Sequence, residues 1–255
     1  GNLLINSQEK DMTRILGIDT GGTYTDGVIL ELPDGKLIGK VKTPTTHEDL
    51  NQCIYRCMQS FEISLRNTLD GICLSTTLAT NAVVENSSQT EGLILIGKMP
   101  QGEIPAQQIR RIPGELDIMG RVKTPLDAEK TEEAIESLRG HVDAIAVSGY
   151  ASVRNPQMEI YVKQKIQQIL GIPVVCAHEL TGELGFYKRT VMADLNARLI
   201  PLIYRLISSV KETMRKLKLD VPLMIVKGDG SIMSDRQALK RPIETVMSGP
   251  AASVT

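Results

Sequence analysis

Alternating apolar and polar positions mark three short strands near the start of the chain. Apolar residues recur over Ile15–Asp19, Tyr24–Leu32 and Leu37–Val41, and a Pro-Asp-Gly-Lys turn at 33–36 joins the last two stretches. Turns of this composition connect adjacent strands. We therefore expect residues 15–41 to form an antiparallel three-stranded meander.

After residue 45 the apolar spacing changes to that of helices alternating with strands. Apolar residues at three- and four-residue intervals predict helices, and short continuous apolar runs predict buried strands. The predicted helices are 47–65, 77–85, 127–138, 155–170, 186–217 and 235–240, and the predicted strands are 71–75, 92–96, 142–148, 174–177, 223–226 and 244–247. Residues 97–125, rich in Pro and Gly, receive no assignment. The expected architecture is an α/β fold with a mixed sheet.

The texture of the sequence changes near residue 185, where the long predicted helix begins. We expect one domain over residues 12–185 and the beginning of a second, incomplete α/β domain over 186–255. The 255 residues are 42% hydrophobic and 23% charged. A chain of this composition can bury a sizeable core and is not expected to be disordered.

Charge and cysteine content argue against several functional classes. The 29 basic and 30 acidic residues leave a formal charge of -1, and only 3% of the residues are aromatic. We therefore expect no nucleic-acid partner. The chain has no apolar run of about 18 residues, so no membrane partner is expected either. Four cysteines without a CxxC pair or a Cys/His cluster predict buried, reduced thiols, no zinc site and a cytoplasmic location.

The most informative motif is the segment 17–26, GIDTGGTYTD. Asp19 ends the first strand, Gly21-Gly22 forms a turn, and Thr23 and Thr25 bring hydroxyl groups to the start of the next strand. Glycines let backbone N–H groups approach phosphate oxygens, and hydroxyls can donate to them. Asp19 would repel phosphate unless a divalent cation lay between, which suggests Mg²⁺ bound through water. An ordinary Asp-Gly-Gly hairpin is the alternative, but the whole combination favours a nucleotide-phosphate loop.

Two other motifs resemble known sites only in part. The run from Gly92 to Gly97-Lys98 resembles a P-loop, but Met99 replaces the hydroxyl residue that would hold Mg²⁺, and the intervening residues predict a buried strand. His178-Glu179 begins a zinc-protease pattern, yet Gly182 stands where the second histidine is needed. We interpret neither motif as a site.

The segment 17–26 resembles the first phosphate motif of the acetate kinase/sugar kinase/Hsp70/actin superfamily. A wider set of segments resembles the hydantoinase/oxoprolinase family, of the hydantoin-utilisation protein A type. These segments follow the family's order from about residue 14 to 252: 75–85, 112–116, 120–122, 143–148, 154–156, 179–190, 195–197 and 241–252. The resemblance implies a ribonuclease-H-like (actin-like ATPase) domain with a mixed sheet, followed by the start of a second α/β domain.

The function implied by the resemblance is that of an ATP-dependent hydrolase that opens a cyclic amide or imide ring of the 5-oxoproline or hydantoin type. The ring carbonyl would be phosphorylated first, with ATP and Mg²⁺ as cofactors. The implied partners are a small cyclic amide substrate and either further copies of the chain or a partner subunit. A non-catalytic or regulatory nucleotide-binding subunit that acts with a partner chain is an open alternative. A small-molecule kinase of the same superfamily is a third, disfavoured by the breadth of the resemblance outside the phosphate loop.

The resemblance also assigns roles to individual residues of the hairpin. Asp19 corresponds to the acid nearest the metal, and Asp26 is either a base that positions water or a structural residue. The phosphate loop corresponds to Gly21, Gly22, Thr23 and Thr25. We predict Asp19 and Asp26 as the catalytic pair.

Further polar positions correspond to substrate-side residues of the family. Those at the start of a predicted helix, suited to an anion or a carbonyl, are Thr76, Thr77 and Asn81. Arg189 and Asn196 match a polar pair that contacts either substrate or neighbouring helices. Ser248-Gly249-Pro250 matches a structural turn.

Two departures from the family pattern change the expectation. Leu74-Ser75 stand where the family usually has His-Gly, so a basic group is missing there. A second acid-Gly-Gly-Thr motif does not occur within the 255 residues. We therefore expect this chain to supply one half of an ATP cleft and only the beginning of the other, as a fragment of a full enzyme.

Overall fold

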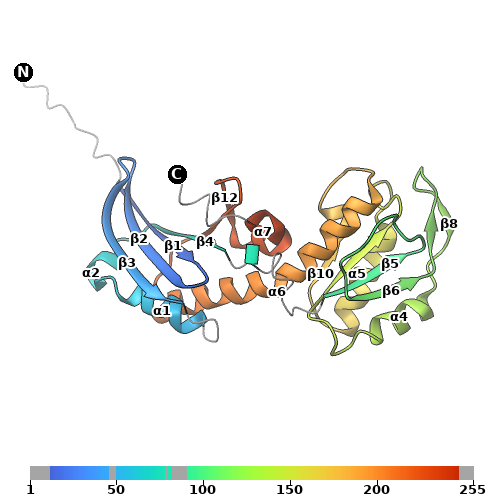
Figure 1. The fold of residues 1–255 in the computed structure, drawn as a ribbon, viewed down its shortest axis with the longest axis horizontal. Coiled ribbons are helices and arrows are strands. Elements are labelled where there is room, and N and C mark those ends of the chain that lie inside the picture. Colours follow the sequence, from blue (N-terminus) through green and yellow to red (C-terminus); the bar gives the residue numbers. More distant parts are fainter. Residues whose placement is uncertain (1–11, 46–49, 78–79, 82–90, 247–255) are drawn as a thin grey trace, which may run out of the picture. The chain divides into compact units, whose positions relative to one another are not determined.

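The fold was obtained as a computed structural model that describes residues 12–45, 50–77, 80–81 and 91–246 (Figure 1). The chain forms two compact units. Unit 1 contains residues 1–78, 206–235 and 245–255, and unit 2 contains residues 79–205 and 236–244. Each unit therefore combines segments that are far apart in the sequence. The division of the sequence near residue 185 stays a prediction.

Unit 1 is built on a six-stranded mixed sheet in the order β12-β11-β4-β1-β2-β3. Its strands are β1 (Thr13–Thr20), β2 (Tyr24–Leu32), β3 (Lys36–Pro44), β4 (Gly71–Thr76), β11 (Leu223–Val226) and β12 (Ile232–Ser234). β1, β2 and β3 pair antiparallel, whereas β4 pairs parallel to both β1 and β11. The predicted meander and the mixed sheet are confirmed.

The two faces of the unit 1 sheet differ in burial. Leu16, Ile18 and Thr20 of β1 are fully or almost fully buried, whereas Asp19, on the other face, is only partly buried. Helices α1 (Leu50–Gln59) and α2 (Ile63–Arg66) follow β3. A Cβ atom added to Gly27 of β2 would lie 2.7 Å from Cys57 Sγ, so α1 packs directly on the buried face. The alternation of side chains along β1 therefore leaves Asp19 on the more open face.

Unit 2 contains a four-stranded parallel sheet in the order β10-β9-β5-β6. Its strands are β5 (Glu91–Ile96), β6 (Gln108–Ile112), β9 (Ala144–Gly149) and β10 (Val174–Cys176). Its remaining elements include the hairpin β7 (Glu115–Leu116) and β8 (Val122–Thr124), the helices α4 (Ala128–Glu136) and α5 (Gln157–Ile169), and the turn η1 (Ala177–Glu179). Apolar clusters cover both faces, with residues of α4 and α5 in one cluster and residues of α6 in the other. This two-sided burial explains why β5 and β9 are continuous apolar runs.

Helix α6 (Phe186–Lys216) contributes residues to both units, because the division falls between Arg205 and Leu206. Pro201 lies inside this helix. The last described elements are α7 (Asp235–Lys240) and η2 (Pro242–Thr245). Within the described residues, every helix is too short or too polar to span a bilayer.

Several predicted elements need correction. The helix expected over 47–65 is two helices, α1 and α2, separated by a turn, and the strand expected over 244–247 is replaced by η2. The unassigned region 97–125 contains β6, β7 and β8. β6 is an edge strand with the sequence QIRRI, whose two arginines hide the apolar signal of a buried strand. Of the helix expected over 77–85, only residues 80–81 are described as helical.

Candidate functional site

The predicted phosphate loop is a tight turn between β1 and β2. The Gly21 N–H donates to the Tyr24 carbonyl at 3.0 Å and closes the turn. A Cβ atom added to Gly21 would lie 3.0 Å from the same carbonyl, a distance that a side chain does not normally tolerate. Thr23 is exposed at the tip of the turn. The Gly21 N–H is therefore used within the turn. The N–H groups of Gly22 and Thr23 and the exposed Thr23 hydroxyl are the candidate donors to a phosphate.

Four polar side chains lie in one row across the end of the unit 1 sheet. Asp19 pairs with Asp26 on one side and with Ser75 on the other, and Asp26 pairs with Lys42. Directly paired residues point to the same face of a sheet. The Ser75 hydroxyl donates to Asp19 Oδ1 at 2.7 Å and fixes the orientation of this carboxylate.

The two carboxylates of this row differ in their surroundings. Within the described residues, the second oxygen of Asp19 accepts no hydrogen bond, so it can serve a ligand. Asp26 is 45% exposed, and its Oδ1 lies 3.6 Å from Lys42 Nζ. The same ammonium group lies 4.7 Å from the centre of the Tyr24 ring. Asp19 is therefore the better oriented of the two acids.

The side chain of Thr25 points into the core of unit 1. This residue is fully buried, and its hydroxyl lies 2.9 Å from Thr45 Oγ1 and 3.1 Å from Cys53 Sγ. Its neighbour Thr20 is also fully buried, and within the described residues its hydroxyl has no hydrogen-bond partner. The role of Thr25 in phosphate binding stays a prediction, and only its backbone lies at the turn.

The end of β4 is joined to the end of β1. Thr76 is buried, and its hydroxyl donates to the Thr20 carbonyl at 3.3 Å, as does the N–H of Thr77. These bonds place Thr76 and Thr77 beside the phosphate loop, at the end of β4 next to Ser75. Asn81 belongs to unit 2 and is partly buried in a helical conformation.

The other two predicted substrate residues lie in unit 2 and bind neighbouring backbone. Arg189 is fully buried, and its guanidinium donates to the carbonyls of Glu183 at 2.8 Å and of Gly149 at 3.2 Å. Asn196 is also fully buried and bridges the Met192 carbonyl at 2.7 Å and the Ile243 N–H at 3.2 Å. Both side chains hold elements together in the structure, and a contact with substrate stays a prediction. The Ser248-Gly249-Pro250 turn lies outside the described residues.

Sequence reasoning did not assign Ser75 to the site. The residue was noted only as a departure from the family pattern, yet it supplies the hydrogen bond that orients Asp19. The signal that could have found it is the strand register, because a parallel β4 beside β1 places Ser75 opposite Asp19. Lys42 was also missed, because its place opposite Asp26 depends on the register between β2 and β3.

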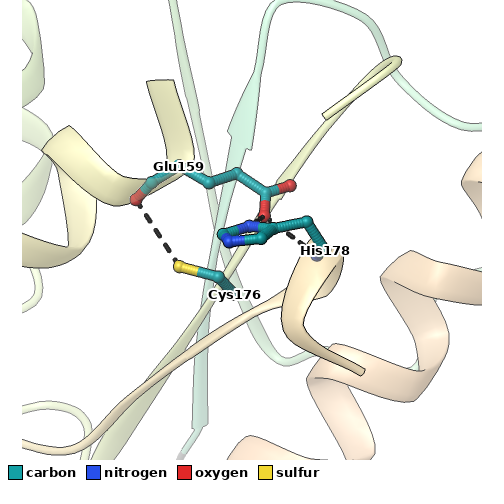
Figure 2. A group of neighbouring side chains, drawn as sticks. All are labelled: Glu159, Cys176 and His178. Carbon is teal, nitrogen blue, oxygen red and sulfur yellow. Dashed lines mark hydrogen bonds and ion pairs between the residues drawn. The ribbon is translucent and has the colours of Figure 1, made fainter. Parts of the chain in front are cut away.

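A second cluster, absent from the sequence-based expectations, lies at the end of β10 in unit 2 (Figure 2). Side-chain atoms of Glu159, Cys176 and His178 lie within 4.8 Å of one another, and all three residue types can bind metal. The sequence analysis did not recognise that Cys176 and His178 come together, and the absence of a zinc site stays a prediction. All four cysteines are free thiols, as predicted, and three of them are buried, whereas Cys73 is only partly buried.

The hydrogen bonds of this cluster explain it without a metal ion. The buried Glu159 carboxylate accepts the Gly149 N–H at 2.8 Å, the His178 N–H at 3.1 Å and a contact from His178 Nδ1 at 2.5 Å. Burial raises the pKa of the Cys176 thiol, whereas metal binding requires a thiolate. We interpret the cluster as a structural link between β9, α5 and β10.

Comparisons with known proteins cover almost the whole chain. Residues 15–170 match the family described as hydantoinase/oxoprolinase N-terminal region, and residues 189–255 match the family described as hydantoinase/oxoprolinase. The caprolactamase subunit alpha of Pseudomonas jessenii is 27% identical over an alignment of 270 positions, which covers 93% of this chain and 38% of that protein. The chain thus spans about two fifths of the length of this relative.

Solved structures show the same fold. One of these structures is a nucleotide-free acetone carboxylase, an enzyme of ATP-dependent acetone carboxylation. It superposes with a TM-score of 0.78 at 18% identity, over 95% of this chain and 40% of that chain. The ATP-dependent caprolactamase from Pseudomonas jessenii superposes with a TM-score of 0.75 at 24% identity, over 94% of this chain and 39% of that chain. The predicted α/β fold with a mixed sheet is confirmed.

Proposed function

Because this chain belongs to the hydantoinase/oxoprolinase family, we propose that it forms the phosphate-binding half of an ATP-dependent enzyme that opens a cyclic amide ring. The substrate class is a small lactam or cyclic imide of the 5-oxoproline or hydantoin type. A relative is named a caprolactamase, and caprolactam is a cyclic amide. The caprolactamase whose structure has been solved is described as an ATP-dependent enzyme.

The observation that carries this proposal is the turn at Gly21-Gly22 with Asp19 oriented beside it. Backbone N–H groups of the turn and the Thr23 hydroxyl would receive the phosphate oxygens of ATP. The bond from Ser75 keeps one oxygen of Asp19 occupied and the other available. A hairpin without a function would not need an oriented carboxylate at its partly buried edge.

The donor set at this edge fits a magnesium ion. Mg²⁺ prefers carboxylate oxygen and water, and Asp19 has one oxygen free of hydrogen bonds within the described residues. Asp19 would hold the ion through water, with the Asp26 carboxylate opposite on the next strand. When bound, the ion supplies positive charge that offsets the charge of the transferred phosphoryl group.

The reaction proposed for the complete enzyme has three steps. The amide carbonyl oxygen attacks the terminal phosphorus of ATP, the bond to the bridging oxygen breaks, and ADP leaves. Two molecules of water then complete the hydrolysis. The first adds to the activated carbon, and the ring C–N bond breaks to give the amine and an acyl phosphate. The second hydrolyses this acyl phosphate, so that phosphate and the ring-opened carboxylic acid are released. In this chain, the turn would bind and orient the phosphates, and Asp26 would accept a hydrogen bond or a proton from water at its exposed carboxylate.

A second candidate is a nucleotide-binding subunit that acts only with a partner chain. This candidate is favoured by the name of the relative, which is a subunit of a larger enzyme. In that case, the phosphate site would have the same residues, while the ring-opening chemistry would need groups from the partner. The two candidates differ in what the isolated chain does after it has bound ATP.

Isothermal titration of Mg-ATP into the 255-residue chain tests the site directly. We expect saturable binding that Asp19→Ala weakens at least about tenfold, because the variant loses the carboxylate nearest the metal. Asp34→Ala is the matched control, since it removes a carboxylate from the β2–β3 turn, at the opposite end of β2 from the proposed site. Equal binding by Asp19→Ala, or no binding at all, would contradict the proposed site in this chain.

Phosphate release with 5-oxoproline, hydantoin or caprolactam then separates the two candidates. Release that depends on one of these substrates supports the ring-opening enzyme. Binding of ATP without any release supports the subunit that needs a partner chain.

A further inference from the structure

The parallel sheet of unit 2 has a topological switch point between β5 and β9. The chain leaves β5 for β6 on one side, and it leaves β9 for β10 on the other. In open parallel sheets, ligands bind outside the carboxyl ends of the strands at such a point, because the two connections diverge and leave a crevice. The fold of unit 2 therefore has a preferred location for a ligand.

A pocket of about 530 Å³ lies at this location. Its lining comes from residues 98–101 after β5, from Tyr150 after β9, and from Glu183 and residues 185–188 at the start of α6. All of these residues belong to unit 2. We refer to this cavity as the switch-point pocket. Lys98, which belongs to the incomplete P-loop motif, thus lines the switch-point pocket and not a P-loop.

The walls of the switch-point pocket are held in place by specific contacts. Gly97 has a φ of 72°, and a Cβ atom there would lie 2.0 Å from the Gly114 carbonyl oxygen, so only glycine allows the chain to turn after β5. The Tyr187 hydroxyl donates to the Glu103 carbonyl at 2.7 Å and secures the other end of this segment. Tyr150 and Phe186 meet edge to face with their ring centres 5.8 Å apart. The pocket is therefore preformed.

Charge in and around the pocket favours an anion. The lining contains two lysines, Lys98 and Lys188, and one carboxylate, that of Glu183. Lys98 Nζ lies 4.5 Å from the centre of the Tyr150 ring, and its ion-pair partner Glu115 is shared with Lys123. Within the described part of the chain, Lys188 has no ion-pair partner.

Helix α6 begins at this pocket with an unfavourable charge pattern. Its first turn contains Lys188 and Arg189 and no acidic residue. The positive end of a helix dipole normally attracts acidic side chains and disfavours basic ones. The first N–H groups of the helix also lack acceptors within the helix. A bound anion would compensate both the dipole and the two basic side chains.

We propose that the switch-point pocket binds a small organic carboxylate. The carboxylate group would lie between Lys98 and Lys188 at the start of α6, and the apolar body would contact Tyr150 and Phe186. Because every group involved belongs to unit 2, this site does not depend on the nucleotide site proposed in unit 1. Arg189 is a positioning residue here, since it holds the backbone of Glu183 and Gly149 and does not line the cavity.

Benzoate is a suitable probe, because it combines a carboxylate with a flat apolar body, and benzamide is its neutral counterpart. In ligand-observed NMR titrations of the 255-residue chain, we expect benzoate to bind at millimolar concentration and benzamide at least about tenfold more weakly. The double variant Lys98→Gln/Lys188→Gln should lose about tenfold in benzoate affinity, and Glu183→Gln should gain about twofold. Lys130→Gln/Lys165→Gln, on α4 and α5 of the same unit, removes the same charge away from the pocket and should bind as the parent chain does.

Three results would overturn the proposal: benzamide bound as tightly as benzoate, a pocket double variant that binds like the parent, or no benzoate binding up to about 50 mM. Inorganic phosphate added as a competitor distinguishes a general anion site from a carboxylate site. Phosphate that displaces benzoate at equal concentration would argue against a role for the aromatic walls. Asp19→Ala should leave benzoate binding unchanged, so a failure of this site is distinguishable from a failure of the nucleotide site.

Discussion

The two units place polar side chains at strand ends in opposite ways. In unit 1, antiparallel and parallel neighbours of β1 bring Asp19, Asp26 and Ser75 into one row, the proposed site of a cation. In unit 2, parallel strands and the start of α6 bring Lys98 and Lys188 to one pocket, the proposed site of an anion. The net charge of -1 for the whole chain conceals both edges.

The difference shows that the pairing pattern of a sheet determines which residues can form a site. A row across paired strands is fixed by register, so a single hydrogen bond such as that from Ser75 to Asp19 can orient it. A pocket at a switch point depends on loops, so it relies on residues that shape the backbone, such as Gly97. The geometry of the row should therefore be less sensitive to changes in loops than the geometry of the pocket.

The largest expected effect is that of Gly97→Ala, which should disrupt the switch-point pocket of unit 2 and leave the proposed site of unit 1 unchanged. The new methyl group would collide with the Gly114 carbonyl at a positive φ, which we expect to cost about 3 kcal/mol or more in unfolding free energy. Gly140→Ala is the control, because Gly140 has a similar φ of 73° with nothing within 4 Å, and it should cost about 1 kcal/mol. Urea unfolding measures both values.

Titrations of the folded Gly97→Ala variant with benzoate and with Mg-ATP then test whether the two proposed sites are independent. Benzoate binding should be lost while Mg-ATP binding is retained. Loss of both ligands, with the fold intact by circular dichroism, would refute the independence of the two sites.

A smaller effect is expected from a buried carboxylate of unit 2, the unit whose pocket favours anions. Asp194 is fully buried, and burial together with the nearby Glu91 raises its pKa to about 7, against the opposing effect of Arg198. Since the pKa in the folded state exceeds that of the unfolded chain, its stabilising contribution is present below about pH 4 and is lost as the pH rises toward 7.

Asp194→Asn should therefore stabilise the protein at pH 8 and not at pH 4. We expect a gain of about 1–2 kcal/mol in unfolding free energy at pH 8. The neutral amide removes a buried negative charge whose nearest cationic atom, Arg198 Nη2, is 3.7 Å away. Thermal unfolding of both proteins between pH 4 and pH 8 measures the difference. A gain that does not change with pH would mean that Asp194 is already neutral or already fully paired.

The sequence predicted those features that depend on neighbouring residues. The meander, the buried strands β4, β5 and β9 and the long helix α6 follow from apolar spacing, and the turn at Gly21-Gly22 follows from its glycines. The helix predicted over 127–138 begins with a local contact of this kind, because the Asp127 side chain accepts the Lys130 N–H and caps α4. Features that join distant segments could not be predicted in this way. Ser75 and Asp19 are 56 residues apart in sequence, and the switch-point pocket combines three separate segments.

The smallest expected effect concerns the hydroxyl group that orients Asp19. Ser75 is almost fully buried, and Ser75→Ala removes its bond to Asp19 while leaving the strand backbone unchanged. We expect a loss of about 1 kcal/mol in unfolding free energy and about threefold in Mg-ATP affinity, because the carboxylate would no longer be held toward its ligand. Ser64→Ala, at an exposed serine of α2, is the control for removing a hydroxyl. If Ser75→Ala binds Mg-ATP like the parent chain, Asp19 does not need orientation by its neighbour, and the row across β4, β1 and β2 is not what separates unit 1 from unit 2.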